Sequence, residues 1–325
     1  MGRQARPGPS GPATVLLLGA SGFLGASLNF HLSRDPLLRV IGVSRDPHSD
    51  KPINDYSRPA LSEAFDRWAP NFVVNCVGLV GHEKVESSPD LARDLNVLLP
   101  QLLAELSLER KIGLIHFSSD SVYSGSRDLA PFSEDSPTVP FSLYGRQKLE
   151  SEARVLDENP FALVLRVNFF GWSRDRRSGM LDHFVSHAID GSRPIGYSDY
   201  FASSLYVGEL ARTISHVVRS PVTGVFNVGS PDSHSKLTFG REVFLGMGLD
   251  PKQVIPSNPA IWAKEGVVSR DLSMSSRKIE SSLAISLAPQ LEGIQKAYDD
   301  LESFLRFCGT SGVDQRRSIL KGARP

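Results

Sequence analysis

The segment TVLLLGASGFLG near the amino terminus constrains the fold more than any other part of the chain. An apolar run typical of a buried strand ends at Gly19, and Gly22 and Gly25 follow before a stretch with helical periodicity. A glycine-rich turn between a strand and a helix is the arrangement that binds the pyrophosphate of a dinucleotide. The alternative is a turn that uses glycine only for its backbone freedom. The residues predicted to contact a dinucleotide here are Gly19, Ser21, Gly22, Phe23, Leu24 and Gly25.

Short apolar runs alternate with stretches that have the spacing of amphipathic helices. The runs are TVLLLG, RVIGVS, FVVNCVG, KIGLIHFSS and FALVLRV. They are nearly continuous in large apolar residues, as strands buried on both faces should be. The helices are predicted over 23–35, 59–68, 88–108, 140–156, 181–189, 205–218 and 291–307. This alternation predicts an α/β fold, a Rossmann-type doubly wound parallel sheet with a smaller, interleaved C-terminal substrate lobe.

The alternation of predicted strands and helices becomes less regular after Arg166, which indicates a domain boundary near this residue. We expect a flexible segment over 1–12 and an NAD(P)-binding Rossmann domain over 13–166. Residues 167–307 are expected to form mainly the substrate-binding lobe, with 222–230 returning to the sheet. Residues 308–325 are polar and basic and are expected to form a flexible tail.

Composition excludes several classes of protein. The chain has 36 basic and 36 acidic residues and a formal net charge of +0, so it has no strong field to draw it to nucleic acid or to an anionic membrane. No stretch approaches the ~20 apolar residues of a membrane span. Cys76 and Cys308 are too few for a disulfide framework and lack metal-ligand spacing. We therefore expect a cytoplasmic protein with no metal, nucleic-acid or membrane partner.

The end of the second predicted strand bears on the choice of dinucleotide. It carries Ser44 and Arg45 where an NAD enzyme usually has an acidic residue for the ribose hydroxyls. A guanidinium can grip a 2′-phosphate that a carboxylate would repel, although Asp46 follows and Arg45 could instead be a solvated loop residue. NADP is therefore the expected cofactor, with NAD as the alternative. Asp55 is a candidate adenine contact or a helix N-cap.

A catalytic constellation is predicted from two elements further along the chain. Tyr144 and Lys148 stand four residues apart on a predicted helix and therefore share one face. Ser118 and Ser119 end a predicted strand at the sheet edge where α/β proteins bind ligands. Reduction of a carbonyl needs a proton donor, and an ammonium nearby is expected to lower the pKa of a tyrosine toward neutrality. A serine hydroxyl beside it can hold the carbonyl oxygen.

With these motifs in this order, the chain resembles the extended short-chain dehydrogenase/reductases, and among them the dTDP-4-dehydrorhamnose reductase family. SSDSVYSG is similar to that family's serine/threonine–aspartate–aromatic motif, and PFSLYGRQKLESEARV to its tyrosine–lysine helix. The resemblance implies that Ser119 is the catalytic hydroxyl, Tyr144 the acid and Lys148 the ribose-binding lysine. It also implies that the cofactor is lined by Asn75, Val77 and Gly78, and that Asn96 lies near the active-site lysine.

Departures from the family pattern bear on the substrate. Asp120 is followed by Ser121 instead of a second acid, which argues against a sugar-nucleotide dehydratase. The loop FFGWSRDRRSGM could bring Arg174, Arg176 or Arg177 to a diphosphate or could be a solvated loop.

Three functions stay open. The resemblance favours an NADPH-dependent reductase of a nucleotide-linked 4-keto-6-deoxy sugar, with a homodimer as the candidate assembly. A sugar-nucleotide 4-epimerase, or another ketone reductase, is the second. A non-catalytic NADP-binding subunit, like the regulatory β subunit of methionine adenosyltransferase, is the third.

Overall fold

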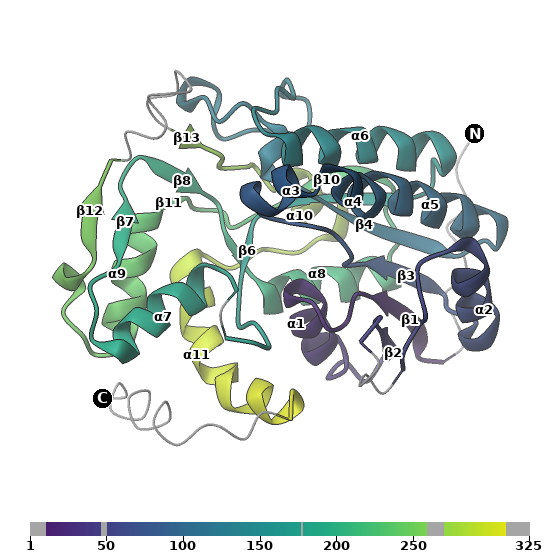
Figure 1. Cartoon of the computed structure of the whole chain (residues 1–325), viewed down its shortest axis with the longest axis horizontal. Helices are drawn as coiled ribbons and strands as arrows, with labels where there is room; N and C mark the ends of the chain where they lie inside the picture. Colours follow the sequence, from purple (N-terminus) through teal and green to yellow (C-terminus); the bar gives the residue numbers. More distant parts are fainter. Residues whose placement is uncertain (1–10, 47–50, 177, 259–269, 310–325) are drawn as a thin grey trace.

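The computed structural model describes residues 11–46, 51–176, 178–258 and 270–309. A parallel sheet of six strands, in the order β10-β5-β4-β3-β1-β2, forms the centre of this part of the chain (Figure 1). Its strands are β1 (Ala13–Leu18), β2 (Leu38–Val43), β3 (Phe72–Asn75), β4 (Gly113–Ser119), β5 (Leu163–Val167) and β10 (Gly224–Val228). Residues 1–10 and 310–325 of the two predicted terminal segments lie outside the described residues. The predicted Rossmann-type α/β fold is confirmed.

The connection between the strands creates a switch point at β1. From β1 the chain crosses to β2 on one side, then returns to β3 on the other and continues through β4 and β5. Doubly wound sheets bind their ligands beyond the carboxyl ends of the strands at such a point. The strands are apolar because both faces are covered: Val15, Leu16, Leu17 and Leu18 are all 0% exposed.

Helices cover each face of the sheet and make two separate cores. One core joins the sheet to α1 (Phe23–Leu32), α8 (Val207–Arg219) and α11 (Gln290–Phe307). The other joins it to α2 (Arg58–Trp68), α5 (Leu99–Glu109) and α6 (Leu143–Glu158). Since α8 and α11 come from the later part of the chain, that part is packed onto the Rossmann unit.

The helix predicted over 88–108 is interrupted. Pro89–Arg93 forms α4, Asp94–Leu98 forms a π-helical turn, and α5 follows. A short helix, α3 (His82–Ser87), precedes them. The π-turn contains Asn96, one of the predicted site residues, and π-turns inside helices often mark functional sites.

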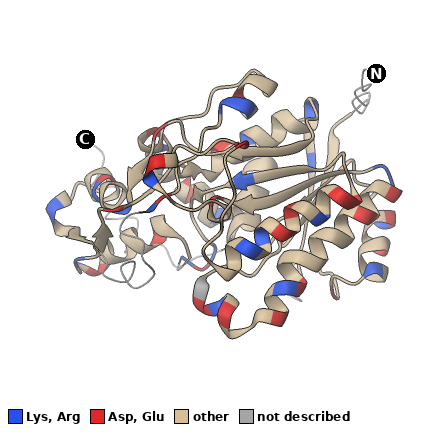
Figure 2. Ribbon diagram, turned by 90° about the horizontal axis from the view of Figure 1, so that it is seen from above, with Lys and Arg blue, Asp and Glu red and all other residues tan. Residues whose placement is uncertain are grey.

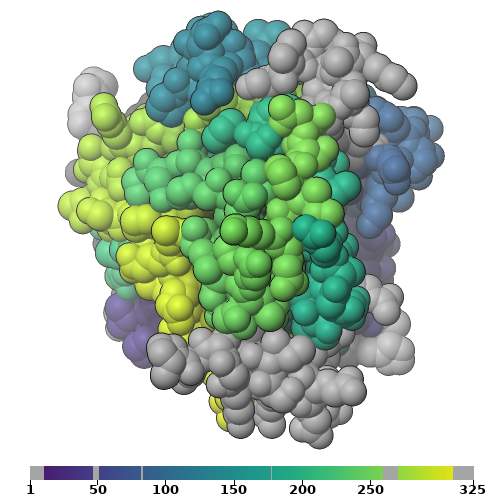
Figure 3. Space-filling model, turned by 90° about the vertical axis from the view of Figure 1, so that its left-hand side faces the viewer, coloured from purple at the N-terminus to yellow at the C-terminus, as the bar shows by residue number. Residues whose placement is uncertain are grey.

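Small sheets carry the remaining chain beyond β5. β8 (Tyr200–Ala202) pairs with β11 (His234–Ser235) on one side and with β13 (Arg270–Asp271) on the other. The other strands are β6 (Phe169–Phe170), β7 (Ile195–Tyr197), β9 (Leu205–Tyr206) and β12 (Ile255–Ser257), and the helices are α7 (Met180–Asp190), α9 (Lys236–Gly246) and α10 (Arg277–Leu283). On the face that lies at the left of Figure 1, the green segments of the later chain and the yellow α11 form one continuous surface (Figure 3).

Acidic and basic residues are mixed along the outward-facing helices (Figure 2), in keeping with the balanced net charge. Within the described ranges, no helix has both the length and the apolarity that crossing a membrane would require.

Candidate active site

The end of β4 and the start of α6 bring Ser119 and Tyr144 together. The Ser142 side chain caps α6 by accepting a hydrogen bond from Gly145 N at 3.0 Å. Gly145 packs so closely on the turn after β4 that an added Cβ would lie 2.2 Å from Ser121 O. This contact sets the first turn of α6, which carries Tyr144, beside Ser119.

The surroundings of Tyr144 raise its pKa. The main cause is burial, and the negative charge of Asp120 adds to it, while the hydrogen bond with Ser119 acts in the opposite direction. The expectation that Lys148 would lower this pKa toward neutrality is therefore wrong for the structure, in which burial and Asp120 raise the pKa of Tyr144. A phenol with a raised pKa keeps its proton at neutral pH, which is the state a proton donor needs.

Lys148 lies in the interior one turn further along α6. Its Nζ donates a hydrogen bond to Phe117 O at 2.9 Å, and the residue is 4% exposed. Burial lowers the pKa of Lys148 to about 8, and the charge of Glu152 partly opposes this shift. The Lys148 side chain is therefore charged at neutral pH and loses its proton at a pH of about 8.

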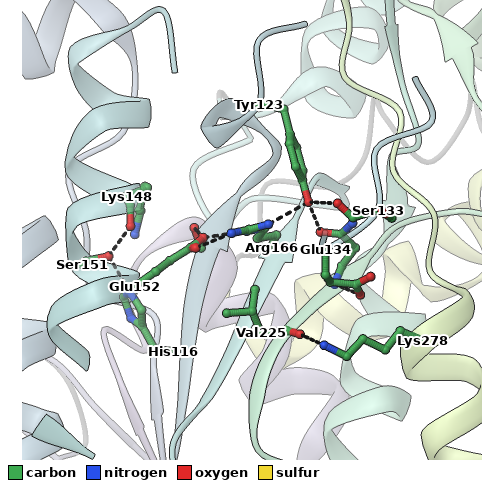
Figure 4. A network of polar contacts seen from close by, with 12 residues as sticks. His116, Tyr123, Ser133, Glu134, Lys148, Ser151, Glu152, Arg166, Val225 and Lys278 are labelled. Carbon is green, nitrogen blue, oxygen red and sulfur yellow. Dashed lines mark hydrogen bonds and ion pairs between the residues drawn. The ribbon is translucent and has the colours of Figure 1, made fainter. Parts of the chain in front are cut away.

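A second set of buried polar contacts lies beside Lys148 and joins Glu152, Arg166 and Tyr123 (Figure 4). Arg166 Nε and Nη2 donate to the two oxygens of Glu152 at 2.9 and 2.7 Å, and both side chains are nearly inaccessible. Ser118 Oγ donates to Glu152 Oε1 at 2.5 Å, and Arg166 Nη1 donates to Tyr123 Oη at 2.8 Å. The sequence analysis did not predict the ion pair between Glu152 and Arg166. The spacing of four between Lys148 and Glu152, which places both on one helix face, was an available signal for Glu152.

Asp120 is a second buried acid at this site. It accepts hydrogen bonds from Ser119 Oγ at 2.9 Å and from Asn168 Nδ2 at 2.5 Å. Burial raises its pKa, while these hydrogen bonds and the positive charge of Lys236 act to lower it. Lys236 begins α9, and its Nζ lies 4.2 Å from the centre of the Tyr200 ring. Asn168, Tyr200 and Lys236 were not predicted. Asn168 directly follows a strand end, which is a usable signal, whereas Lys236 has no local motif.

Asn75 ends β3, Val77 and Gly78 follow it beside Lys148, and Asn96 approaches them from the π-helical turn. Asn75 Oδ1 accepts from Val77 N at 3.0 Å, and Asn96 is bonded to both backbone groups of Leu79 at 2.9 Å. A Cβ added to Gly78 would lie 3.0 Å from Asn96 Oδ1 and 3.7 Å from Lys148 Nζ. Because Gly78 has no side chain, nothing at this position covers the backbone on the side that faces Lys148.

The glycine loop has the geometry that a dinucleotide requires. Gly19 has φ of +79°, and a Cβ on Gly25 would lie 2.1 Å from Gly19 O, so helix and strand touch there. Ser21 and Gly22 are exposed, and Phe23 and Leu24 are half-buried at the start of α1. The exposed turn leaves backbone N–H groups at the start of α1 available to an anion. The residues present thus fit a bound pyrophosphate.

The other predicted cofactor residues lie near the end of β2. Arg45 is exposed, and its guanidinium carbon lies 5.2 Å from the centre of the Tyr56 ring. Asp55 is also exposed and accepts from Ser57 N at 2.7 Å. The N-cap of α2 is Ser57, so the N-cap interpretation of Asp55 was two residues early.

The arginine-rich loop does not form a single cationic patch. Arg176 is buried, pairs with Asp182 at 3.0 Å and stacks over Trp172 at 4.0 Å, so it is neither a solvated residue nor a free diphosphate contact. Arg174 is exposed and lies 3.7 Å from Asp46. Arg177 lies outside the described residues. In the part of the chain that the structure covers, no group of three or more His, Cys, Asp or Glu residues is placed to hold a metal ion.

The arrangement of Ser119, Tyr144 and Lys148 beside a dinucleotide loop can be compared with known proteins. The family described as "RmlD substrate binding domain" matches residues 13–303. The chain belongs to this family. It is 33% identical over 251 residues to a probable dTDP-4,6-dihydroxy-2-methyloxan-3-one 4-ketoreductase of Streptomyces antibioticus, covering 77% of this chain and 82% of the relative. It is 27% identical over 300 residues to a probable low-salt glycan biosynthesis reductase of Haloferax volcanii, covering 89% and 99%.

A solved structure also resembles this member of the RmlD family. The dTDP-4-dehydrorhamnose reductase of Bacillus anthracis, solved in complex with NADP, has a TM-score of 0.77 and 17% identity, covering 89% of this chain and 99% of that one. At this identity the likeness shows the fold. The related reductases bear out the prediction of an oxidoreductase, and the fold is the one that the sequence motifs predicted.

Proposed function

We propose that this chain is an NADPH-dependent reductase of a nucleotide-linked 4-keto-6-deoxy sugar, in the manner of dTDP-4-dehydrorhamnose reductase. The observation that carries the proposal is the placement of Tyr144, on the first turn of α6, beside Ser119, with Lys148 one helical turn away, at the edge of the sheet where the glycine loop lies. The names of the related reductases support the substrate class, and the absence of an acid at Ser44 and Arg45 supports NADP over NAD.

The residues of this chain have distinct tasks in the proposed reaction. The nicotinamide, when bound, supplies a hydride to the carbonyl carbon. Ser119 Oγ orients the carbonyl oxygen by hydrogen bonding, and Tyr144 Oη gives that oxygen a proton as negative charge develops on it. Lys148 holds the ribose hydroxyls through its ammonium, while the bare backbone at Gly78 lets the cofactor approach. Gly19, Ser21, Gly22, Phe23, Leu24 and Gly25 form the pyrophosphate site.

Asp120 has a positioning role in this scheme. Its carboxylate accepts from both Ser119 and Asn168, so it holds the serine hydroxyl in place until the substrate carbonyl oxygen replaces it as the acceptor. Its negative charge also helps to keep the proton on Tyr144.

The experiment that tests the proposal is NADPH oxidation against a panel of nucleotide-linked keto sugars, run with the wild type and with Tyr144→Phe. We expect turnover of at least one 4-keto-6-deoxy sugar, and a fall of about 10²–10⁴-fold in the variant with cofactor affinity retained. An enzyme that returns its hydride to the same sugar, and leaves NADPH unconsumed, would show an epimerase instead. A protein that binds NADPH and converts no sugar would have a non-catalytic role.

A further inference from the structure

Lys236 carries an ammonium group that has no ionic partner in the part of the chain that the structure describes. The residue begins α9 directly after β11, which pairs with β8 (Figure 1). It is half-buried, and its Nζ lies 4.2 Å from the centre of the Tyr200 ring and 5.8 Å from that of Tyr197. The two rings attract the ammonium and hold it in place. Among the described residues, no hydrogen bond or ion pair engages its Nζ.

The stability of the fold does not account for a cation at this position. A positive charge is unfavourable at the amino terminus of a helix, and Lys236 is the first residue of α9. Buried charges are normally paired, and burial lowers the pKa of Lys236. A lysine kept here at a cost to stability indicates a ligand that the ammonium contacts.

Asp120 is the acid on which the charge of Lys236 acts. Burial raises the pKa of Asp120 and lowers that of Lys236, and the charge of each group opposes the shift of the other. Both residues lie in the described part of the chain, where no ion pair joins them. The two groups are therefore close enough to interact electrostatically and too far apart to touch.

The carboxylate of Asp120 has room for one more donor. Its Oδ1 accepts from Ser119 Oγ at 2.9 Å and from Ser121 Oγ at 3.3 Å, and its Oδ2 accepts from Asn168 Nδ2 at 2.5 Å. A carboxylate offers about four acceptor sites. One site on Oδ2 is therefore open to a donor from a ligand.

The separation between the ammonium and the carboxylate is set by the fold. Asn168 Oδ1 accepts from Ser204 Oγ at 2.6 Å, and Ser204 lies two residues beyond the end of β8. This hydrogen bond ties the strand that carries Tyr200 to the partner of Asp120. Arg270, which lies opposite Tyr200 on the neighbouring strand β13, is only 1% exposed. Lys236 is therefore the cation of this cluster that a ligand can reach.

A hydroxyl group is the neutral group that satisfies both charges at once. It has one O–H donor for the carboxylate and two lone pairs that accept from an ammonium. A carbonyl or ether oxygen could serve only the ammonium. A protonated amino group would bind the carboxylate and be repelled by the ammonium.

We propose that Lys236 and Asp120 together bind a hydroxyl group on the carbon next to the reacting carbonyl of the sugar. The inference rests on the proposed function, because that function places the carbonyl oxygen at Ser119, whose Oγ lies 2.9 Å from Asp120. In a 4-keto-6-deoxy pyranose the hydroxyl is the one on C3, since C5 carries the methyl group and the ring oxygen. Lys236 thereby restricts the substrate to α-hydroxy ketones.

The test compares kcat/KM for a nucleotide-linked 4-keto-6-deoxyhexose and for its 3-deoxy analogue. The variant Lys236→Met removes the ammonium and keeps a chain that covers the Tyr200 ring. It should lower kcat/KM for the hydroxylated sugar roughly ten- to hundredfold, as expected for one charge-assisted hydrogen bond, and change that of the 3-deoxy analogue by less than about threefold. The difference between the two losses measures the contact between ammonium and hydroxyl.

The matched control is Lys278→Met, because Lys278 also lies over an aromatic ring, 4.5 Å from the centre of Phe226, and donates to Val225 O. It should leave both kcat/KM values unchanged. Lys236→Arg keeps the charge and should keep most of the preference for the hydroxylated sugar. The NADPH dissociation constant shows whether each variant is folded. Should Lys236→Met fail to bind NADPH, the comparison is made with Lys236→Gln.

The possible failures are distinguishable. An equal loss for both sugars in Lys236→Met would mean that the ammonium acts on a group common to both, such as the diphosphate or Asp120 itself, and would overturn the hydroxyl site. A wild type that reduces both sugars equally well overturns it too, while the proposed reductase stands. A wild type that binds NADPH and reduces neither sugar refutes the proposed function, and the hydroxyl site with it.

Discussion

Replacing Glu152 by Gln tests whether the buried ion pair with Arg166 is structural support for the active site. The change keeps the size of the side chain and removes its charge. Arg166 would then keep its positive charge in the interior, where its side chain is 6% exposed. One of its two hydrogen bonds to the 152 side chain would also become an unfavourable contact between donors, because an amide has only one acceptor oxygen.

The expected cost follows from this burial. Removing one partner of a buried pair typically destabilises a protein by about 3–5 kcal/mol, whereas replacing both partners by apolar residues is often nearly neutral. Denaturant unfolding of Glu152→Gln should therefore show a loss in that range. The double variant Glu152→Leu, Arg166→Met should lose clearly less than the single variant, since it leaves no uncompensated charge. A single variant within about 1 kcal/mol of the wild type, or a double variant that is worse than the single one, would refute the reasoning.

The same substitution has a second effect at Lys148. The charge of Glu152 opposes the lowering of the Lys148 pKa by burial, so its removal should move that pKa further below about 8. NADPH affinity of Glu152→Gln should then begin to fall at a lower pH than in the wild type. A purely structural role would weaken the fold but leave the pH at which affinity falls unchanged.

Three more predictions follow from the site. Lys148 loses its charge above a pH of about 8, so NADPH affinity should fall above that pH in the wild type, and this pH dependence should vanish in Lys148→Met together with most of the affinity. Ser119→Ala should lower kcat about 10²-fold or more with cofactor dissociation constants unchanged, because it removes a donor to the reacting oxygen; an unchanged kcat would exclude that role. Gly25→Ala places a Cβ 2.1 Å from Gly19 O, so it should destabilise the fold by roughly 1–3 kcal/mol and weaken the binding of both NADPH and NADH in titration. The control is Gly191→Ala, at a position with open space but a positive φ, which should lose stability and keep its cofactor affinity.

The parts of the site that could be predicted from the sequence are those formed by residues close together in the chain. The glycine loop was found because Gly25 must touch the Gly19 carbonyl, a demand that leaves a readable spacing. Tyr144 and Lys148 were found because both lie on one helix face. These are contacts between residues close in the chain, and the order of the strand, loop and helix around them is visible without a structure.

What escaped prediction depends on segments that only the fold brings together. The positive charge of Lys236 acts on Asp120 because the pairing of β8 with β11 brings the start of α9 toward the end of β4, far away in the sequence. Arg174 and Asp46 meet because the loop after β6 turns back toward the end of β2. The π-helical turn that carries Asn96 also gave no periodic signal, since the apolar spacing of 88–108 fits one uninterrupted helix.

The charges around Tyr144 also correct the chemical picture that the motif alone suggests. A tyrosine and a lysine four residues apart invite the interpretation that the lysine makes a phenolate. In the structure the two pKa values move in opposite directions: burial and Asp120 raise that of Tyr144, and burial lowers that of Lys148 to about 8. Pairs of groups whose surroundings push their pKa values apart indicate which form each one takes. Here the phenol is protonated and the ammonium charged at neutral pH, which suits reduction, where Tyr144 must begin each cycle with a proton to give.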